Sequence, residues 1–376
     1  MKVDDLILIK TLGKGNFGEV FLTQKKGCKE FYATKRLDRA YSEKQENIKR
    51  LQNEISILKK IKHPNIVSLI DLKKTKGHIY IVMEYCNGGG LSSCLKKYKE
   101  INHRPFSEEI VQYIMRQIVN AVNFLHFNKI IHRDLKLDNI LVTFNSEKDR
   151  KTLNMMEAKI KIIDFGFSTT LKSSKSNLTY TVLGTPANMD PQILQNLHFG
   201  AINPTGYDDK ADIWSLGTLC YEMLVGHMPF SGSSFPDLYQ KVEQGKYSLP
   251  TNLSEEVVSF IDAMLQKDPN KRLNSQELLK HDFLIKNTKS FKPLDVRNFH
   301  GKIRPDGKIQ ISAGSNLPNK GGTIWDFVMQ AFFHQNPIKQ NGIHQHQTNS
   351  QNTYITPQIK KFREQINNPN PLSEFY

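Results

Sequence analysis

Cysteines are few in this sequence, and long apolar runs and internal repeats are missing. The 376 residues include four cysteines, which lack the regular spacing of a disulfide framework, so we expect a reducing compartment and a cytoplasmic location. No run of about 18 apolar residues occurs, which argues against a membrane-spanning helix. The N-terminal stretch MKVDDLILIK has acidic residues before a short apolar run, unlike a signal peptide.

The net charge is strongly positive, but no dense basic block accompanies it. The chain has 52 Lys and Arg against 37 Asp and Glu, a formal charge of +15, and from Lys286 on 12 basic residues outnumber 5 acidic ones. Such an excess can attract nucleic acid or acidic lipid. Because no stacking motif interleaves with the charge, a solvated basic surface is the better interpretation, and nucleic-acid binding is not expected.

Apolar periodicity indicates where strands and helices lie, and the length suffices for two or more lobes with their own cores. Alternating side chains predict strands within the first 35 residues and at 79–86. Apolar residues three and four positions apart predict a helix over 42–60 and a long buried helix over 110–125. Strands follow in NILVTF and AKIKII, and residues 209–283 are mostly helical in pattern.

The last part of the chain has a different composition. Residues 289–376 are rich in Asn, Gln, His, Pro and Gly, bury little apolar surface and are predicted to be mostly disordered. TIWDFVMQAFF at 323–333 is the one tail segment able to form a helix and dock. A regulatory subunit that binds the chain through this tail is an expectation that follows.

A glycine-rich stretch, GKGNFGEV, places Gly13, Gly15 and Gly18 between two predicted strands. Glycines there let backbone N–H groups approach phosphate oxygens closely. A plain hairpin turn explains the pattern about as well. Because a strand rather than a helix follows, the stretch is not a dinucleotide-binding fingerprint.

Two charged residues fall on elements that otherwise look apolar. Glu54 lies on the apolar stripe of the helix predicted over 42–60, where an unpaired carboxylate would be costly. Lys35 lies on a predicted strand and is the expected cationic partner, although a lysine on a strand is usually exposed to solvent. The pair would hold the lysine ready for phosphate oxygens.

Two polar stretches interrupt predicted core. In IIDFGF, Asp164 ends an apolar strand, where a carboxylate suits Mg²⁺, although Asp-x-Gly also favours a simple turn. In IIHRDLKLDNIL, at 130–141, Asn139 can complete the magnesium site. Asp134 can accept a hydroxyl proton, and Lys136 can neutralise a transferring phosphoryl group. Positioning and charge neutralisation of this kind are what phosphoryl transfer requires.

Taken together, residues 4–285 resemble the catalytic domain of eukaryotic protein kinases. The motifs occur in the order of that family: the glycine loop, Lys35, Glu54, HRDLKLDN, DFG, GTP, DIWSLG and Arg272 in DPNKRL. The resemblance implies a two-lobed α+β fold, with a small β-rich N-lobe at about 1–84 and a large, mainly helical C-lobe at about 88–288. It implies that the domain at 1–288 uses ATP and Mg²⁺ to phosphorylate protein substrates.

The resemblance also assigns roles to single residues. Nucleotide-binding positions would be Leu12, Gly13, Gly15, Gly18, Val20, Ala33, Lys35, Met83, Glu84, Cys86 and Leu141. Among these, Met83 would be the gatekeeper, and Glu84 and Cys86 would offer hinge backbone groups to adenine. Asp134, Lys136, Lys35 and Glu54 would be catalytic, Asn139 and Asp164 would bind metal, and Asp212 would hold the catalytic loop.

Specificity and regulation follow from the same resemblance. Lys136 together with Thr185 in GTP resembles serine/threonine rather than tyrosine kinases. Thr181 stands where the activating phosphate usually falls, with Arg133 as its partner, and Phe167 after DFG implies a preference for serine. MEYCNGGG and HRDLKLDNIL resemble most the unc-51-like kinases, which initiate autophagy.

Several positions depart from the family pattern. DPQ at 190–192 replaces the usual Ala-Pro-Glu, whose glutamate pairs with the arginine that matches Arg272. Gln192 can hydrogen-bond this arginine, but without full charge compensation. Asn188 replaces a common tyrosine, and Gly90 replaces a hinge-side acid. A pseudokinase scaffold is therefore an alternative, although its usual signature is loss of a catalytic lysine or aspartate, and all are present.

Overall fold

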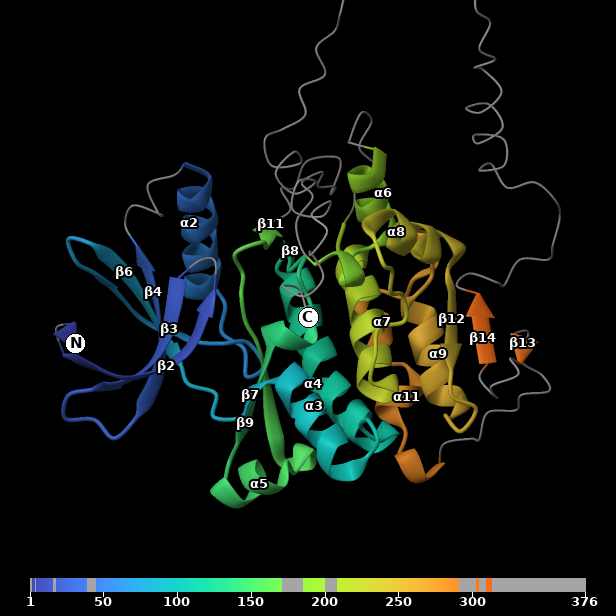
Figure 1. Cartoon of the computed structure of the whole chain (residues 1–376), viewed down its shortest axis with the longest axis horizontal. Helices are drawn as coiled ribbons and strands as arrows, with labels where there is room; N and C mark the ends of the chain where they lie inside the picture. Colours follow the sequence, from blue (N-terminus) through green and yellow to red (C-terminus); the bar gives the residue numbers. More distant parts are fainter. Residues whose placement is uncertain are drawn as a thin grey trace, which may run out of the picture.

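The computed structural model describes most of the first 290 residues and two short tail segments, namely 2–3, 5–15, 18–38, 45–170, 185–199, 208–290, 302–303 and 309–312. Figure 1 shows two lobes, a strand-rich one that contains the N-terminus and a larger, mainly helical one. This confirms the predicted two-lobed α+β fold. Among the described helices, none is both long enough and apolar enough to cross a membrane.

The N-lobe is an antiparallel sheet with one long helix. Its elements are β1 (Lys2–Val3), β2 (Leu6–Gly15), β3 (Gly18–Lys25), β4 (Phe31–Asp38), α2 (Gln45–Lys60), β5 (Leu69–Lys74) and β6 (His78–Glu84). The strands lie in the order β1-β2-β3-β4-β6-β5. The early strands, the strand expected at 79–86 and the helix expected at 42–60 are thus present, the last within its described part.

Helices make up most of the C-lobe. They are α3 (Leu91–Asn102), α4 (Glu108–Phe127), α5 (Glu147–Thr152), α6 (Pro191–Phe199), α7 (Lys210–Val225), α8 (Phe235–Gln244), α9 (Glu255–Met264), α10 (Ser275–Leu278) and α11 (Asp282–Ile285). α4 begins where the Ser107 side chain accepts a hydrogen bond from the Ile110 N–H, with two glutamates in the first turn. α4 and α7 are largely buried and form the centre of the lobe.

Short strands and 3-10 turns carry the polar motifs. They are β7 (Gly89–Gly90), β8 (Ile130–Ile131), η1 (Leu137–Asn139), β9 (Ile140–Phe144), η2 (Met155–Glu157), β10 (Ala158–Ile162), β11 (Thr169–Thr170), η3 (Pro186–Asn188), η4 (Pro269–Lys271) and η5 (Thr288–Ser290). β9 and β10 pair with Ile140 opposite Ile162. Because Asn139 precedes β9 and Asp164 follows β10, both lie at the same end of this hairpin.

Part of the tail belongs to the domain, which the sequence did not predict. β14 (Ile309–Ser312) pairs antiparallel with β12 (Lys246–Leu249), and β13 (Lys302–Ile303) pairs with the other edge of β14 (Figure 1). The boundary expected from the sequence set all of 289–376 apart from the domain at 1–288, whereas these two strands form a sheet with β12 of the C-lobe and are too short to show a period. The helix expected at 323–333 lies outside the described residues.

Candidate active site

The predicted ion pair of Lys35 and Glu54 is present. Lys35 on β4 places its Nζ 3.2 Å from Oε1 of Glu54 on α2, and the two side chains are 17% and 8% exposed. Burial raises the pKa of Glu54, Lys35 opposes this, and the charge of Asp164 raises the pKa further. The three side chains also line one small cavity. The fold thus brings a lysine and two carboxylates from three elements together.

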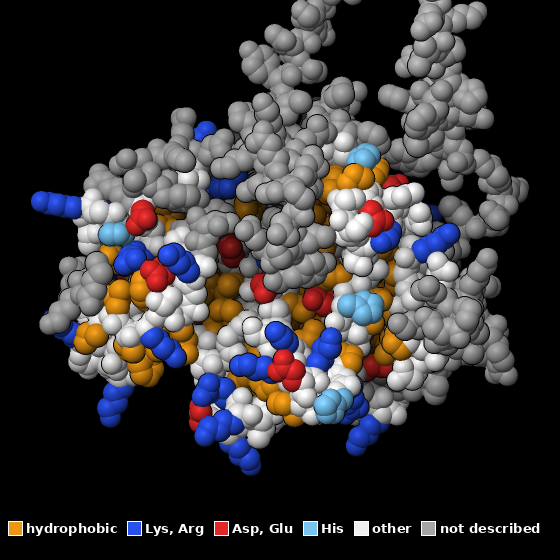
Figure 2. All heavy atoms as spheres, viewed as in Figure 1, with side chains coloured by type: hydrophobic (Ala, Val, Ile, Leu, Met, Phe, Trp, Pro, Cys, Tyr) orange, Lys and Arg blue, Asp and Glu red, His pale blue; other side chains and the backbone are white. Residues whose placement is uncertain are grey.

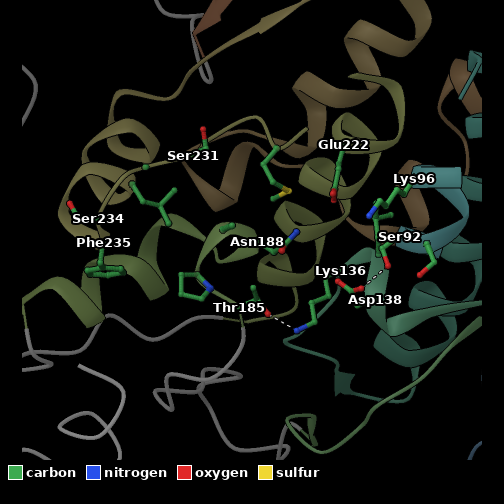
Figure 3. A pocket seen from close by; sticks show the side chains of 17 residues that line it. Ser92, Lys96, Lys136, Asp138, Thr185, Asn188, Glu222, Ser231, Ser234 and Phe235 are labelled. Atoms are coloured by element: carbon green, nitrogen blue, oxygen red, sulfur yellow. Dashed lines mark hydrogen bonds between the residues drawn. The ribbon is translucent and has the colours of Figure 1, made fainter. Parts of the chain in front are cut away.

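Asp134 is the centre of a second cluster. Its carboxylate is buried, and Oδ1 accepts hydrogen bonds from the backbone N–H and the hydroxyl of Thr185, both at 3.0 Å. Oδ2 accepts one from Nδ2 of Asn139 at 2.7 Å. Lys136 places its Nζ 2.7 Å from the Thr185 hydroxyl (Figure 3). The same Nζ lies 3.4 Å from Asp134 Oδ2. Residues predicted to act together are therefore within hydrogen-bond reach of one another.

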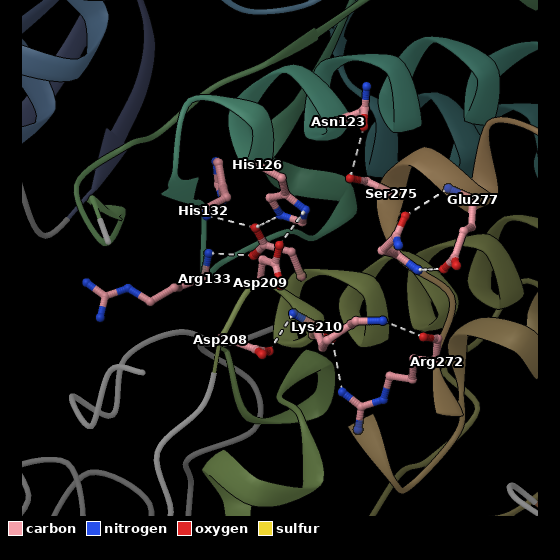
Figure 4. A network of polar contacts seen from close by, with 12 residues as sticks. Asn123, His126, His132, Arg133, Asp208, Asp209, Lys210, Arg272, Ser275 and Glu277 are labelled. Atoms are coloured by element: carbon pink, nitrogen blue, oxygen red, sulfur yellow. Dashed lines mark hydrogen bonds and ion pairs between the residues drawn. The ribbon is translucent and has the colours of Figure 1, made fainter. Parts of the chain in front are cut away.

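Asp212 at the start of α7 holds the loop that carries Asp134. Its carboxylate accepts hydrogen bonds from the backbone N–H groups of His132 and Arg133, each at 2.8 Å, and from Nε2 of His126 at 2.9 Å (Figure 4). Complete burial alone would raise the pKa of Asp212, but the hydrogen bond and charge of His126 outweigh it, so the pKa is lowered. An ionised carboxylate therefore fixes the loop, as the sequence predicted.

Asn139 and Asp164 offer oxygen atoms at the shared end of the β9–β10 hairpin. The Ile163 N–H donates to the Asn139 carbonyl at 3.0 Å, which ties the two segments together. Asp164 has a φ of 65°, a conformation rare for residues other than glycine. No group of three or more acidic, His or Cys side chains suited to a metal occurs in the described part. Mg²⁺ takes one or two protein oxygens and completes its shell with phosphate and water, so these residues fit it.

The glycines form a β2–β3 hairpin in which Gly15 pairs with Gly18. A Cβ on Gly18, whose φ is +135°, would lie 2.1 Å from the Arg36 carbonyl oxygen, so the fold itself requires this glycine. A Cβ on Gly13 would meet open space among the described residues. Gly13 therefore has no local structural reason to be glycine, which agrees with close approach of a ligand.

The predicted adenine positions lie on several strands of both lobes. Val20 pairs with Lys35 across β3 and β4, and Ala33 pairs with Met83 across β4 and β6. Leu141 on β9 pairs with Gly90, beyond the hinge. Leu12 is 40% exposed, whereas Cys86 is buried, and this burial raises the pKa of its thiol. In Figure 2 the surface is hollowed between the lobes, with hydrophobic and acidic side chains showing in the hollow.

Comparison with known proteins decides the family. Residues 6–284 match the model of the protein kinase domain. The chain belongs to the protein kinase family. Similar proteins include the RAC family serine/threonine-protein kinase homolog of Dictyostelium discoideum, 34% identical over 83% of this chain and 64% of that protein. Myosin light chain kinase A of the same organism is 34% identical over 73% of this chain and 86% of its own length.

A further relative shows how much longer such proteins can be. Serine/threonine-protein kinase PLK4 of Danio rerio is 30% identical over 86% of this chain but only 32% of its own length. The chain thus spans 64% and 32% of the RAC homolog and of PLK4. What these relatives share with it is a serine/threonine protein kinase domain.

The kinase hinge contains a side-chain contact that sequence reasoning missed. Oε1 of Glu84 accepts hydrogen bonds from Nζ of Lys161 at 2.9 Å and from the Ser68 N–H at 2.6 Å. Lys161 lies on β10 of the C-lobe, whereas Ser68 precedes β5 of the N-lobe. Glu84 was expected to offer its backbone to adenine, and its carboxylate in addition joins the two lobes. A lysine within the apolar strand β10 was the available signal.

The DPQ departure is compensated in a way that the sequence did not reveal. Arg272 pairs with the carboxylate of Asp190, not with Gln192, and both partners are buried. The expectation that Arg272 lacks full charge compensation was therefore wrong. Asn188, in place of the common tyrosine, donates from Nδ2 to the Thr218 hydroxyl at 3.0 Å.

The predicted regulatory pair is described only in part. Thr181 lies outside the described residues. Arg133 donates from Nε to the Phe167 carbonyl at 2.6 Å and from Nη2 to the Ser168 carbonyl at 3.4 Å. Its φ of 70° is in the left-handed region. The guanidinium thus lies on the segment that directly follows DFG.

A cavity of about 420 Å³ opens beside Asp134's neighbours Lys136 and Thr185 (Figure 3). Its walls come from α3, η3, α7 and α8. Asp138 and Glu222 place two carboxyl groups on the lining. Burial, and then the charge of Asp138, raise the pKa of Glu222 to about 7, although Lys99 opposes this. A phosphate acceptor that enters here would meet acidic groups close to the catalytic loop.

Proposed function

We propose that this chain is an active protein kinase that transfers the γ-phosphate of Mg-ATP to serine and threonine hydroxyls of proteins. The observation that carries this proposal is the cluster around Asp134. Asp134 accepts the proton of the acceptor hydroxyl, and Lys136 neutralises charge on the transferring phosphoryl group. Lys35, held by Glu54, contacts phosphate oxygens. Bound magnesium would screen the phosphate charges, and Asn139 and Asp164 would hold it.

A phosphorylation assay beside a nucleotide-binding assay tests the proposal. The protein is incubated with radiolabelled ATP, magnesium and a peptide library, and ATP affinity is measured separately. We expect the wild type to phosphorylate peptides and Asp134→Asn to lose transfer while it still binds ATP, because Asp134 acts on the acceptor rather than the nucleotide. A wild type that binds ATP without transfer would instead be the pseudokinase scaffold.

Activation by phosphate on Thr181 is part of the proposal. Phosphate there could form charge-assisted hydrogen bonds with Arg133, in exchange for its present bonds to the carbonyls of Phe167 and Ser168. Thr181→Ala should lower activity, and phosphate mapping of the active protein should find Thr181 modified. Unchanged kinetics of Thr181→Ala, with phosphate elsewhere, would contradict it.

We also propose that serine is preferred over threonine as the phosphate acceptor, because the bulky ring of Phe167 disfavours the extra methyl group of threonine. The Phe167 ring lies 5.4 Å from the guanidinium of Arg50, so packing against α2 is its other role. Discrimination by one methyl is modest, about 1–3 kcal/mol at most. Otherwise identical serine and threonine peptides test this preference, and Phe167→Val should shift it toward threonine.

The cellular setting is proposed on sequence resemblance alone. The stretches MEYCNGGG and HRDLKLDNIL support a place of this chain in the unc-51-like branch. Membership in that branch would imply a part in autophagy-type signalling, and a cytoplasmic location is proposed with it. A regulatory subunit would bind through the C-terminal tail. Cells that lack the protein should then fail to form autophagic membranes on starvation. Normal autophagy in such cells would count against the branch.

A further inference from the structure

We infer that Asp190 has taken over the role of the glutamate that protein kinases usually carry two residues later, where this chain has Gln192. Its carboxylate neutralises Arg272 and thereby positions the segment from Thr185 to Asp190 against the catalytic loop. Asp190 is a positioning residue, since it contacts Arg272 rather than nucleotide or acceptor. The kinetic part of this inference rests on the proposed kinase function, whereas its stability part does not.

Arg272 is a buried cation whose charge must be balanced. Its side chain and that of Asp190 are 0% and 1% exposed, and Nη1 donates to Asp190 Oδ2. The guanidinium carbon lies 5.1 Å from the ring centre of Trp214. Its other hydrogen bonds go to the backbone carbonyls of Lys210, Gln266 and Lys267 (Figure 4 shows Arg272 beside Lys210). Among the described residues, Asp190 is its one ion-pair partner. Removing the anion would leave a buried charge unpaired, which is strongly destabilising.

The same carboxylate begins helix α6. Oδ1 of Asp190 accepts a hydrogen bond from the Gln192 N–H at 2.7 Å, and its carbonyl accepts one from the Leu194 N–H at 3.0 Å. Pro191 is the first helical residue, where a missing N–H costs nothing. One oxygen therefore caps the helix while the other pairs with Arg272. Asparagine could still cap, but it could not balance the charge.

Gln192 stands at the position of the family's glutamate but does not take over its role. Its side chain is half-buried and makes no hydrogen bond with Arg272 in the described structure. Because its own N–H is bonded to Asp190, the two residues lie next to each other at the start of α6. The usual family carboxylate stands at position 192, and this chain carries its carboxylate at position 190 instead.

The pair acts on the active site through a short segment fastened at both ends. At one end Thr185 bonds to Asp134, and at the other Asp190 pairs with Arg272. Between them, the Asn188 carbonyl accepts a hydrogen bond from the Ser215 hydroxyl at 2.8 Å. Pro186, Ala187 and Asn188 also line the cavity beside Lys136 and Thr185, where we expect the acceptor peptide. Loss of the Asp190–Arg272 pair should therefore weaken the use of the acceptor peptide. It should leave ATP binding unchanged, because the expected ATP site lies between the lobes.

Asp190→Asn separates the charge from the cap. We expect peptide kcat/KM to fall by at least about tenfold, because a buried cation loses its partner, with a lower unfolding temperature and ATP affinity within about twofold of wild type. Asp268→Asn is the matched control. Asp268 also precedes a proline and accepts a hydrogen bond from the N–H of Asn270, two residues later, at 3.0 Å. It is exposed, however, and forms no ion pair with any residue that the structure describes. Asp268→Asn should leave kcat/KM, the unfolding temperature and ATP affinity unchanged.

Moving the carboxylate is the decisive test. Asp190→Ala should lose activity and stability, and Asp190→Ala with Gln192→Glu should restore kcat/KM to within about threefold of wild type. Unchanged kcat/KM in Asp190→Asn, or a relocated variant as impaired as Asp190→Ala, would overturn the inference. If Asp190→Ala does not fold, the relocated variant decides alone: recovery of a folded, active protein supports the inference, and failure overturns it. If the wild type proves inactive, the unfolding temperatures of the same variants still test the charge exchange.

Discussion

Glu222 is a residue whose charge should change near neutral pH. It lines the cavity beside Lys136 and Thr185 together with Asp138, and burial together with the charge of that neighbour raises the pKa of Glu222 to about 7. Below this pH the carboxyl is mostly neutral, and above it the carboxylate is ionised. A lysine or arginine close to the acceptor hydroxyl should thus bind more tightly as the pH rises.

We predict that KM for a basic acceptor peptide falls several-fold between about pH 6 and about pH 8, because Glu222 becomes ionised over that range. Steady-state kinetics across this range check it. Glu222→Gln cannot ionise and should remove most of this pH dependence, and a peptide without basic residues should show little of it in the wild type. The same profile in wild type and Glu222→Gln would rule the explanation out.

Some side-chain pairs could be predicted from the sequence because a charge in an apolar environment requires a partner. Pairs that depend on the residue at which a helix begins could not. An acid on the apolar stripe of α2 requires a cation, so Lys35 and Glu54 could be paired in advance. The pairing of Arg272 with Asp190 depends on how α6 begins, which no local pattern reveals. Gln192 was the expected partner because it stands where the family usually has the glutamate.

At the scale of elements, long periodic segments were predictable and short strands were not. The helices α2 and α4 repeat their apolar residues over several turns, whereas β14 has four residues and pairs with β12, some sixty positions earlier. Strands of that length need a tertiary partner to form. β12 has a second support, because the Tyr221 hydroxyl donates to the Ser248 carbonyl at 2.6 Å.

This arrangement predicts how the tail can be shortened. Variants that end at residue 313 and at residue 290 should both fold and keep activity, since β12 stays attached to α7. The shorter one loses β14, so its β12 amides should exchange hydrogen faster. Its free energy of unfolding should fall by about 1–3 kcal/mol, because each lost hydrogen bond contributes roughly 0.5–1.5 kcal/mol. Hydrogen exchange compares the two. Equal exchange at β12 would mean that the strand pairing contributes nothing, and an aggregated shorter variant would mean that the tail completes the core.

At the scale of the whole molecule, the two lobes share both a core and a polar contact. One cluster of buried side chains runs from Ile57 and Leu58 on α2 to α4, α7 and α9. Beside it, the Glu84 carboxylate joins Lys161 of the C-lobe to the Ser68 N–H of the N-lobe. The two lobes are thus joined at the hinge by a side-chain contact as well as by the backbone. Because ATP is expected to bind between the lobes, this contact should matter for nucleotide more than for peptide.

We therefore predict that Lys161→Met raises KM for ATP by about fivefold, roughly 1 kcal/mol for a partly exposed ion pair, and leaves KM for peptide unchanged. Methionine keeps the unbranched shape and most of the length of the side chain and removes its charge and its hydrogen-bond donors. Lys159→Met is the control, since Lys159 lies two residues earlier on β10 and is exposed. Steady-state kinetics with each substrate varied in turn give both constants. Equal ATP constants for the two variants, or a rise confined to the peptide constant, would show that the Glu84–Lys161 contact does not set the lobe arrangement that binds ATP.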